Sequence, residues 1–118
     1  MGNVFFGLAV DCADASTLAE FWARVLGRQV APGATTESAV VEAEPGTGPA
    51  PRLGFHRVPE PKMVKNRLHL DLLAADFDSE AQRLIDLGAT PINNVEQGGA
   101  RWTTFTDIEG NEFDLIAG

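Results

Sequence analysis

The sequence predicts an α+β fold built from two βαβββ modules. Both halves of the 118-residue chain follow the same order of one strand, one helix and three further strands, and such a repeat indicates internal duplication. The length suits a single compact domain. Hydrophobic residues make up 44% of the sequence and charged residues 22%, as in folded chains and unlike disordered ones.

Each half contains one expected amphipathic helix with matching end signals. In the first half, Asp14 or Ser16 can cap a helix that ends at Gly27, because short polar side chains favour helix starts and glycine favours the left-handed conformation after the last turn. The apolar residues of this helix recur at steps of three and four, and they are Leu18, Phe21, Trp22, Val25 and Leu26. The second half repeats the arrangement, with Asp76 or Asp78 as the cap and a glycine at the end.

The expected strands are short runs of apolar or alternating residues. In the first half they span residues 4–10, 28–31, 38–44 and 53–58, and in the second half residues 67–73, 90–95, 101–106 and 112–116. The segment Pro45–Pro51 is rich in proline and glycine and is expected to form a surface turn. We therefore expect one domain over residues 1–118, with module one at 1–58, a linker at 59–65 and module two at 66–118.

Charge and cysteine content exclude several classes of partner. Nine Lys and Arg against seventeen Asp and Glu give a net charge of −8, so we expect no nucleic-acid partner and no membrane partner, although a small cationic pocket is still allowed. Cys12 is the only cysteine and cannot form an internal disulfide. The apolar run Val4–Val10 is too short for a membrane span or for most signal peptides, and we expect a cytoplasmic protein. Seven arginines against two lysines suggest a bacterial source.

Four segments resemble the glyoxalase-like branch of the vicinal oxygen chelate superfamily, which includes glyoxalase I, bleomycin-resistance proteins and extradiol dioxygenases. These segments are Phe21–Gly27, Lys65–Asp71, Leu87–Ala89 and Asp107–Phe113. The resemblance implies that the two modules pair into a curved mixed sheet whose concave face holds the ligand. It also implies a homodimer. It assigns a fold better than a reaction, because this superfamily hosts many chemistries.

The resemblance further implies metal ligands on the first and fourth strands of each module. His69 matches the first-strand ligand of module two, whereas the corresponding position of module one is Gly7. Asp114 occupies the last-strand position, where relatives often carry the longer glutamate. Aligning the two halves places His56 on Asp114 and so in the fourth ligand position.

This set of His56, His69 and Asp114 would suit Fe(II), Mn(II), Ni(II) or Zn(II) with open coordination positions. The missing ligand at Gly7 and the short side chain of Asp114 argue instead for a pocket without a complete metal site.

Two further residues near His69 are candidates for contact with a ligand. Asp71 follows His69 by two residues, hence on the same face of a strand, where it could orient the histidine or act as a base. Arg67, on that face too, offers a bidentate fork for a carboxylate or phosphate, or it pairs with Asp71 or Glu112.

Aromatic residues supply the remaining candidates. Trp102 and Phe55 offer ring surfaces for a flat ligand, or they pack in the core, as we expect for Phe5 and Trp22. Lys62 belongs to the linker and is expected to be solvated.

Two functional hypotheses follow. The first is a small-molecule-binding protein of the bleomycin-resistance-like type without a complete catalytic metal site, with ligand contacts from Phe55, Arg67, Asp71 and Trp102. The alternative is a metal-dependent lyase, isomerase or dioxygenase that uses His56, His69 and Asp114. The sequence leaves the enzyme question open.

Overall fold

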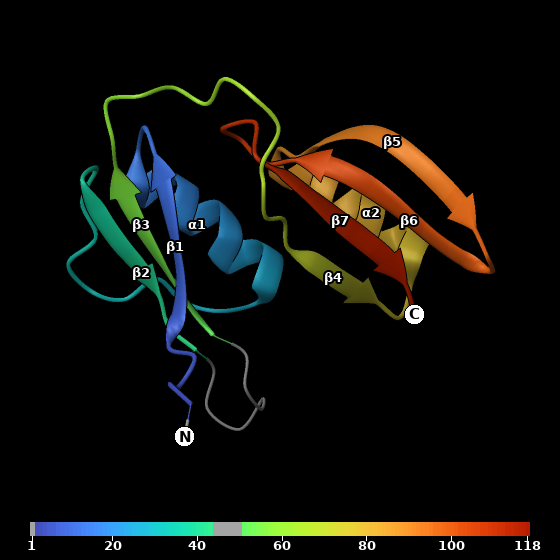
Figure 1. The fold of residues 1–118 in the computed structure, drawn as a ribbon, viewed down its shortest axis with the longest axis horizontal. Helices are drawn as coiled ribbons and strands as arrows, with labels where there is room; N and C mark the ends of the chain where they lie inside the picture. The colour runs from blue at the N-terminus through green and yellow to red at the C-terminus, as the bar shows by residue number, and fades with distance from the viewer. Residues whose placement is uncertain (1, 44–50) are drawn as a thin grey trace. The chain divides into compact units, whose positions relative to one another are not determined.

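A computed structural model describes residues 2–43 and 51–118 of the chain. The chain forms two compact units, Met1–Pro61 and Lys62–Gly118 (Figure 1). The division falls inside the predicted linker 59–65. Each unit contains one sheet and one helix, so the predicted α+β class is confirmed.

The first unit consists of β1 (Gly7–Cys12), α1 (Ala15–Leu26), β2 (Ser38–Val41) and β3 (Arg52–Arg57). Its sheet has the order β1-β3-β2, in which β1 runs parallel and β2 antiparallel to β3. The helix packs on β2 and β3 and covers one face of the sheet (Figure 1). The expected strand at 28–31 is reduced to an isolated bridge between Val30 and Val41.

The second unit consists of β4 (Asp71–Ala74), α2 (Phe77–Leu87), β5 (Thr90–Gln97), β6 (Ala100–Thr106) and β7 (Glu112–Ala117). Its sheet has the order β4-β7-β6-β5, with β4 parallel to β7 and the other pairs antiparallel. The helix α2 packs on β5 and β7. This unit is a complete βαβββ module. In both units we call the face of the sheet away from the helix the open face.

The predicted helix ends are confirmed in both units. The Asp14 carboxylate accepts a hydrogen bond from the Thr17 backbone N–H (3.2 Å), and this bond lowers the pKa of Asp14. Asp76 caps α2 in the same way through Ser79 (3.3 Å). Both helices end at a glycine with positive φ, a conformation that costs glycine little.

Strand alternation places one set of side chains of each sheet in the core. The core of the second unit includes Phe105 and Phe113, which are fully buried and stack with ring centroids 5.6 Å apart. In the first unit, Phe55 and Leu18 are fully buried, and Trp22 is buried as predicted. Because alternate residues point to opposite faces, the neighbours of these core residues along each strand line the open faces.

Three local expectations differ from the structure or fall outside it. Phe5 is 67% exposed and not in the core, since β1 begins only at Gly7. The strand expected at 67–73 begins at Asp71, where pairing with β7 starts. Of the predicted turn Pro45–Pro51, residues 45–50 lie outside the described residues. No helix in the described ranges is long and apolar enough to cross a bilayer.

Candidate functional site

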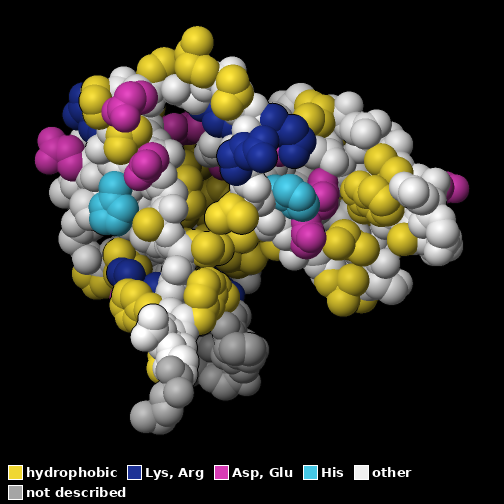
Figure 2. All heavy atoms as spheres, in the orientation of Figure 1, with side chains coloured by type: hydrophobic (Ala, Val, Ile, Leu, Met, Phe, Trp, Pro, Cys, Tyr) yellow, Lys and Arg dark blue, Asp and Glu magenta, His cyan; other side chains and the backbone are white. Residues whose placement is uncertain are grey.

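Three titratable side chains converge on the open face of the second unit. Nδ1 of His69 lies 2.8 Å from Oδ1 of Asp71 and 3.6 Å from Oδ2 of Asp114. The nitrogen and oxygen atoms that these residues offer all lie within 4.8 Å of one another. Figure 2 shows a histidine with acidic side chains beside it at the surface of this unit. We call these residues the His69 cluster.

Strand pairing explains why the His69 cluster forms. Asp71 and Asp114 are register partners in the parallel pair β4–β7, so their side chains stand next to each other on one face. The backbone N–H of Asp114 donates to the carbonyl of Leu70 (2.9 Å), which anchors the segment just before β4. His69 therefore stands two residues before Asp71 on the same side, as the spacing in the sequence predicted.

The two carboxylates of the cluster have different surroundings. The Thr104 hydroxyl donates to Oδ1 of Asp114 at 2.6 Å, and the Asp114 side chain is 17% exposed. Asp71 is 50% exposed and His69 40%. An ionised carboxylate only accepts hydrogen bonds, so the free lone pairs of both aspartates suit a ligand group that carries N–H or O–H.

Apolar side chains continue the open face beside the cluster. Trp102 on β6 pairs in register with Ile116 on β7, and Leu73 on β4 pairs with Ile116 from the other side. Trp102 is half-buried, whereas Leu73 is 77% exposed. The predicted candidates Asp71 and Trp102 thus share the open face with His69 and Asp114.

A second polar contact, which the sequence did not predict, joins the segment before β4 to the first residue of β7. The Lys62 ammonium lies 3.2 Å from Oε1 of Glu112, and the Asn66 backbone N–H donates to the same oxygen at 2.9 Å. Lys62 is therefore paired and not solvated as expected. Partial burial acts to raise the pKa of Glu112, but the bond from Asn66 and the charge of Lys62 outweigh it, and the pKa lies below its ordinary value. Nothing local in the sequence predicts this contact, because Asn66 and Glu112 are 46 residues apart.

Among the described residues of the first unit, no counterpart of the His69 cluster is found on the open face. With the capping residues Asp14 and Asp76 aligned, His69 corresponds to Gly7 and Asp71 to Ala9. The register partner of Ala9 is Gly54, so Gly54 takes the place that Asp114 has in the second unit.

Arg52 occupies the space beside Gly7. A Cβ added to Gly7 would lie 2.7 Å from Cγ of Arg52 and 2.7 Å from its carbonyl oxygen. Since real Cβ atoms do not come this close to other atoms, the position as it stands has no room for a histidine side chain.

The remaining sequence candidates lie elsewhere. His56 lies two residues farther along β3 than Gly54. It stands opposite Asp11 of β1 and Ser38 of β2 and is exposed. Phe55 is fully buried. Arg67 is exposed in the segment before β4, and its two suggested partners are instead bonded to other residues, Asp71 to His69 and Glu112 to Lys62.

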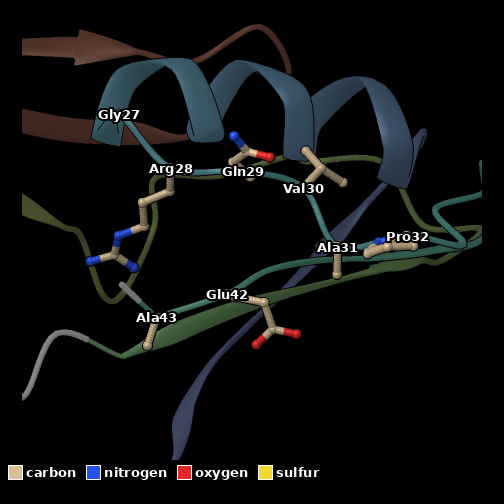
Figure 3. A pocket seen from close by; sticks show the side chains of 8 residues that line it. All are labelled: Gly27, Arg28, Gln29, Val30, Ala31, Pro32, Glu42 and Ala43. Atoms are coloured by element: carbon tan, nitrogen blue, oxygen red, sulfur yellow. The ribbon is translucent and has the colours of Figure 1, made fainter. Parts of the chain in front are cut away.

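A surface pocket of about 380 Å³ in the first unit contains none of these candidates. It is lined by Gly27, Arg28, Gln29, Val30, Ala31, Pro32, Glu42 and Ala43 (Figure 3). The Arg28 guanidinium next to it donates to the carbonyl of Pro51 at 2.8 Å.

The His69 cluster fits a divalent cation in part. One imidazole nitrogen and two carboxylate oxygens are donor types that Fe(II), Mn(II), Ni(II) and Zn(II) accept. Oδ1 of Asp71 and Oδ2 of Asp114 lie 2.8 and 3.6 Å from Nδ1 of His69, and these separations are compatible with three donors on one ion. All three donors come from one edge of one sheet, and the corresponding positions of the first unit offer no donor side chain. Of the two-module ligand positions that the sequence resemblance implies, those of the second unit thus carry donor side chains and those of the first unit do not.

Comparison with known proteins identifies the family. The glyoxalase-like domain family matches residues 7–116, which is nearly the whole chain. The protein therefore belongs to the glyoxalase-like domain family, within the vicinal oxygen chelate superfamily, as its sequence segments predicted. A search of curated proteins finds no match.

Solved structures support the same fold. The E126Q mutant of the fosfomycin resistance protein FosX from Listeria monocytogenes, in complex with Mn(II) and a dihydroxypropylphosphonic acid, superposes with a TM-score of 0.78 at 13% identity and covers 100% of this chain and 92% of its own. A glyoxalase/bleomycin resistance protein/dioxygenase family enzyme from Burkholderia phytofirmans gives 0.73 at 17% identity, covering 92% and 94%. The oxidase ChaP-H2 gives 0.70 at 21% identity, covering 99% and 95%. At these identities the likeness shows the fold alone.

Proposed function

We propose that the protein binds a small organic ligand on the open face of the second unit, in the manner of the bleomycin-resistance-like branch, without a complete catalytic metal site. The observation that carries the proposal is the asymmetry between the units. The second unit presents His69, Asp71 and Asp114, whereas the corresponding positions of the first unit are Gly7, Ala9 and Gly54. A metal site with ligands from both modules would need donor side chains at those positions.

The open face defines the chemistry of the ligand. Asp71 and Asp114 favour hydroxyl, amide or amine groups, because ionised carboxylates accept and do not donate hydrogen bonds. Trp102 and Ile116 beside them favour an apolar or aromatic portion, since a ring can stack on the indole. The ligand is therefore an organic molecule with hydrogen-bond donors at one end and a flat apolar part at the other. Arg67, exposed before β4, could meet an anionic substituent.

A binding screen tests this function. A library of metabolites and antibiotics, measured with chelator present, should give ligands whose affinity falls about tenfold or more in Asp71→Asn or Trp102→Ala, the loss expected for a charged hydrogen bond or a stacked ring. Asp86→Asn, an exposed change on α2, is the control and should bind as the unchanged protein does. Failure of every compound to bind, or equal binding by all variants, would overturn the proposal.

A second candidate function rests on the donor atoms of the His69 cluster. If His56 joined His69 and Asp114, the protein would be a metal-dependent lyase, isomerase or dioxygenase, in which the ion would act as a Lewis acid or hold an oxygen ligand. Here His69 and Asp114 would hold the ion, and Thr104 would orient Asp114 through its hydrogen bond. Metal content that falls in both His56→Ala and His69→Ala would favour this candidate over the first.

The expectations of a homodimer and of a cytoplasmic location accompany the proposal. Analytical ultracentrifugation tests the first, because a mass of one chain at all concentrations would exclude the dimer. Fractionation of the source cells tests the second.

A further inference from the structure

We infer that the open face of the first sheet carries an oxyanion-binding site, formed by Arg52 and His56 on either side of Gly54. The site lies wholly within the first unit, so it does not depend on the function proposed for the His69 cluster. Its ligand is a carboxylate or a phosphate-type group, since both present oxygens that the same donors recognise.

The geometry along β3 brings two nitrogen atoms over one glycine. Arg52, Gly54 and His56 alternate along β3 with the core residues Leu53 and Phe55 and so share the open face, where Gly54 is itself buried. A Cβ added to Gly54 would lie 3.5 Å from Nε2 of His56 and 4.0 Å from Nη1 of Arg52. Both side chains therefore border the space that the missing side chain of Gly54 leaves, from its two ends.

The side walls of this space are small and uncharged. The register partners of Gly54 are Ala9 on β1 and Val40 on β2. On β1, the acidic residue is Asp11, which stands opposite His56 and two register pairs farther along than Gly54. An anion over Gly54 would thus meet two nitrogen groups directly and a carboxylate only diagonally.

The two nitrogen groups are available for a ligand. In the described part of the chain, neither Arg52 nor His56 takes part in an ion pair. The guanidinium group of Arg52 is a planar fork of N–H donors that fits two oxygens. Its guanidinium carbon lies 4.8 Å from the centre of the Phe6 ring, a cation–π contact that holds the head group near the sheet. Such a preformed basic group stands out in a chain with a net charge of −8.

Isotope-labelled protein titrated with inorganic phosphate, and separately with acetate, at constant ionic strength tests the inference. Saturable shifts of the Gly54 amide are expected, with a stronger response to the oxyanion type that the site prefers. Arg52→Met retains the aliphatic stem beside Gly7 and should weaken binding at least tenfold, as loss of a charge-assisted fork predicts. His56→Gln should weaken it less.

Gly54→Ala is the sharper variant, because it keeps both nitrogen groups. The nearest atoms to the added methyl group would be 3.5 to 4.0 Å away, which is ordinary contact, so folding should be unaffected. The methyl group would occupy the space of the anion, and binding should again fall at least tenfold. Arg57→Gln removes the same charge from the opposite face of β3 and should bind normally.

Two results would overturn the inference. One is unchanged phosphate and acetate binding in Arg52→Met or in Gly54→Ala. The other is a response that never saturates or is not centred on Gly54, which would indicate non-specific screening of charge.

Discussion

Thr104 fixes the orientation of Asp114. Its hydroxyl donates to Oδ1 of the carboxylate at 2.6 Å, and the other oxygen, Oδ2, is thereby turned toward Nδ1 of His69 at 3.6 Å. The two residues are register partners on β6 and β7. The pairing of three neighbouring strands, β4, β7 and β6, thus sets both the position and the rotation of the carboxylate that the proposed ligand would meet.

Thr104→Val removes the hydroxyl but conserves the shape of the side chain. We expect folding stability to fall by about 1 kcal/mol, the usual value of such a bond on a partly exposed carboxylate. Affinity for the ligands found by the binding screen should fall about fivefold, because Asp114 would no longer be held in one rotamer. Calorimetric titration measures the change. Thr106→Val, on the same face but opposite Glu112, is the control and should bind the ligands as the unchanged protein does. Equal affinities of Thr104→Val and Thr106→Val would show that Thr104 has no positioning role.

Gly7→Ala tests whether Arg52 leaves no room at the first-strand position of the first unit. The added methyl group would come within 2.7 Å of the Arg52 side chain and backbone, so we expect a loss of about 1–3 kcal/mol in the free energy of unfolding, as for other overpacked positions. Urea denaturation measures it. Gly2→Ala, with no atom within 4 Å, is the matched control. Combining Gly7→Ala with Arg52→Ala should recover only part of the lost stability, since the carbonyl oxygen of residue 52 remains. Equal stability of Gly7→Ala and Gly2→Ala would show that Arg52 does leave room for a side chain at position 7.

The contact of Glu112 with Lys62 and Asn66 predicts a pH dependence of stability. The pKa of Glu112 is lowered in the folded state from an ordinary value of 4.5. Its stabilising contribution is therefore complete above the unfolded pKa and is lost as the pH falls through the folded pKa. Glu112→Gln should be less stable than the unchanged protein by about 1 kcal/mol at pH 7, and the difference should shrink below pH 4.5.

Unfolding midpoints recorded from pH 7 down to pH 3 measure this effect. Glu96→Gln, an exposed change on β5, should give no such trend. A stability difference for Glu112→Gln that stayed constant over the whole pH range would show that the ionised carboxylate is not its source.

Local signals account for what the sequence predicted well. The helix ends depend on Asp14 and Asp76 and on the glycines that follow each helix, all of which act within one turn. The neighbourhood of His69 and Asp71 follows from the two-residue repeat of an extended chain. These features need no knowledge of distant partners, and the structure confirms the elements they define.

Strand register accounts for what the sequence did not predict. Aligning the halves on their aromatic residues placed His56 with Asp114, but the pairing of β1 with β3 places Gly54 there, two residues earlier. A shift of two residues keeps the face and the core pattern unchanged, so the hydrophobic alternation cannot detect it. The contact of Lys62 with Glu112 was missed for a similar reason, because it joins residues 50 positions apart.

The most direct test of the central claim is a protein-detected NMR screen of the binding library, run once with chelator and once with one equivalent of Zn(II). We expect ligands that shift amides of β4, β6 and β7 equally under both conditions, and we expect these shifts to be lost in Asp71→Asn. Ligands that bind only in the presence of Zn(II), with metal retention lost in His69→Ala, would contradict it and establish the metal-dependent alternative.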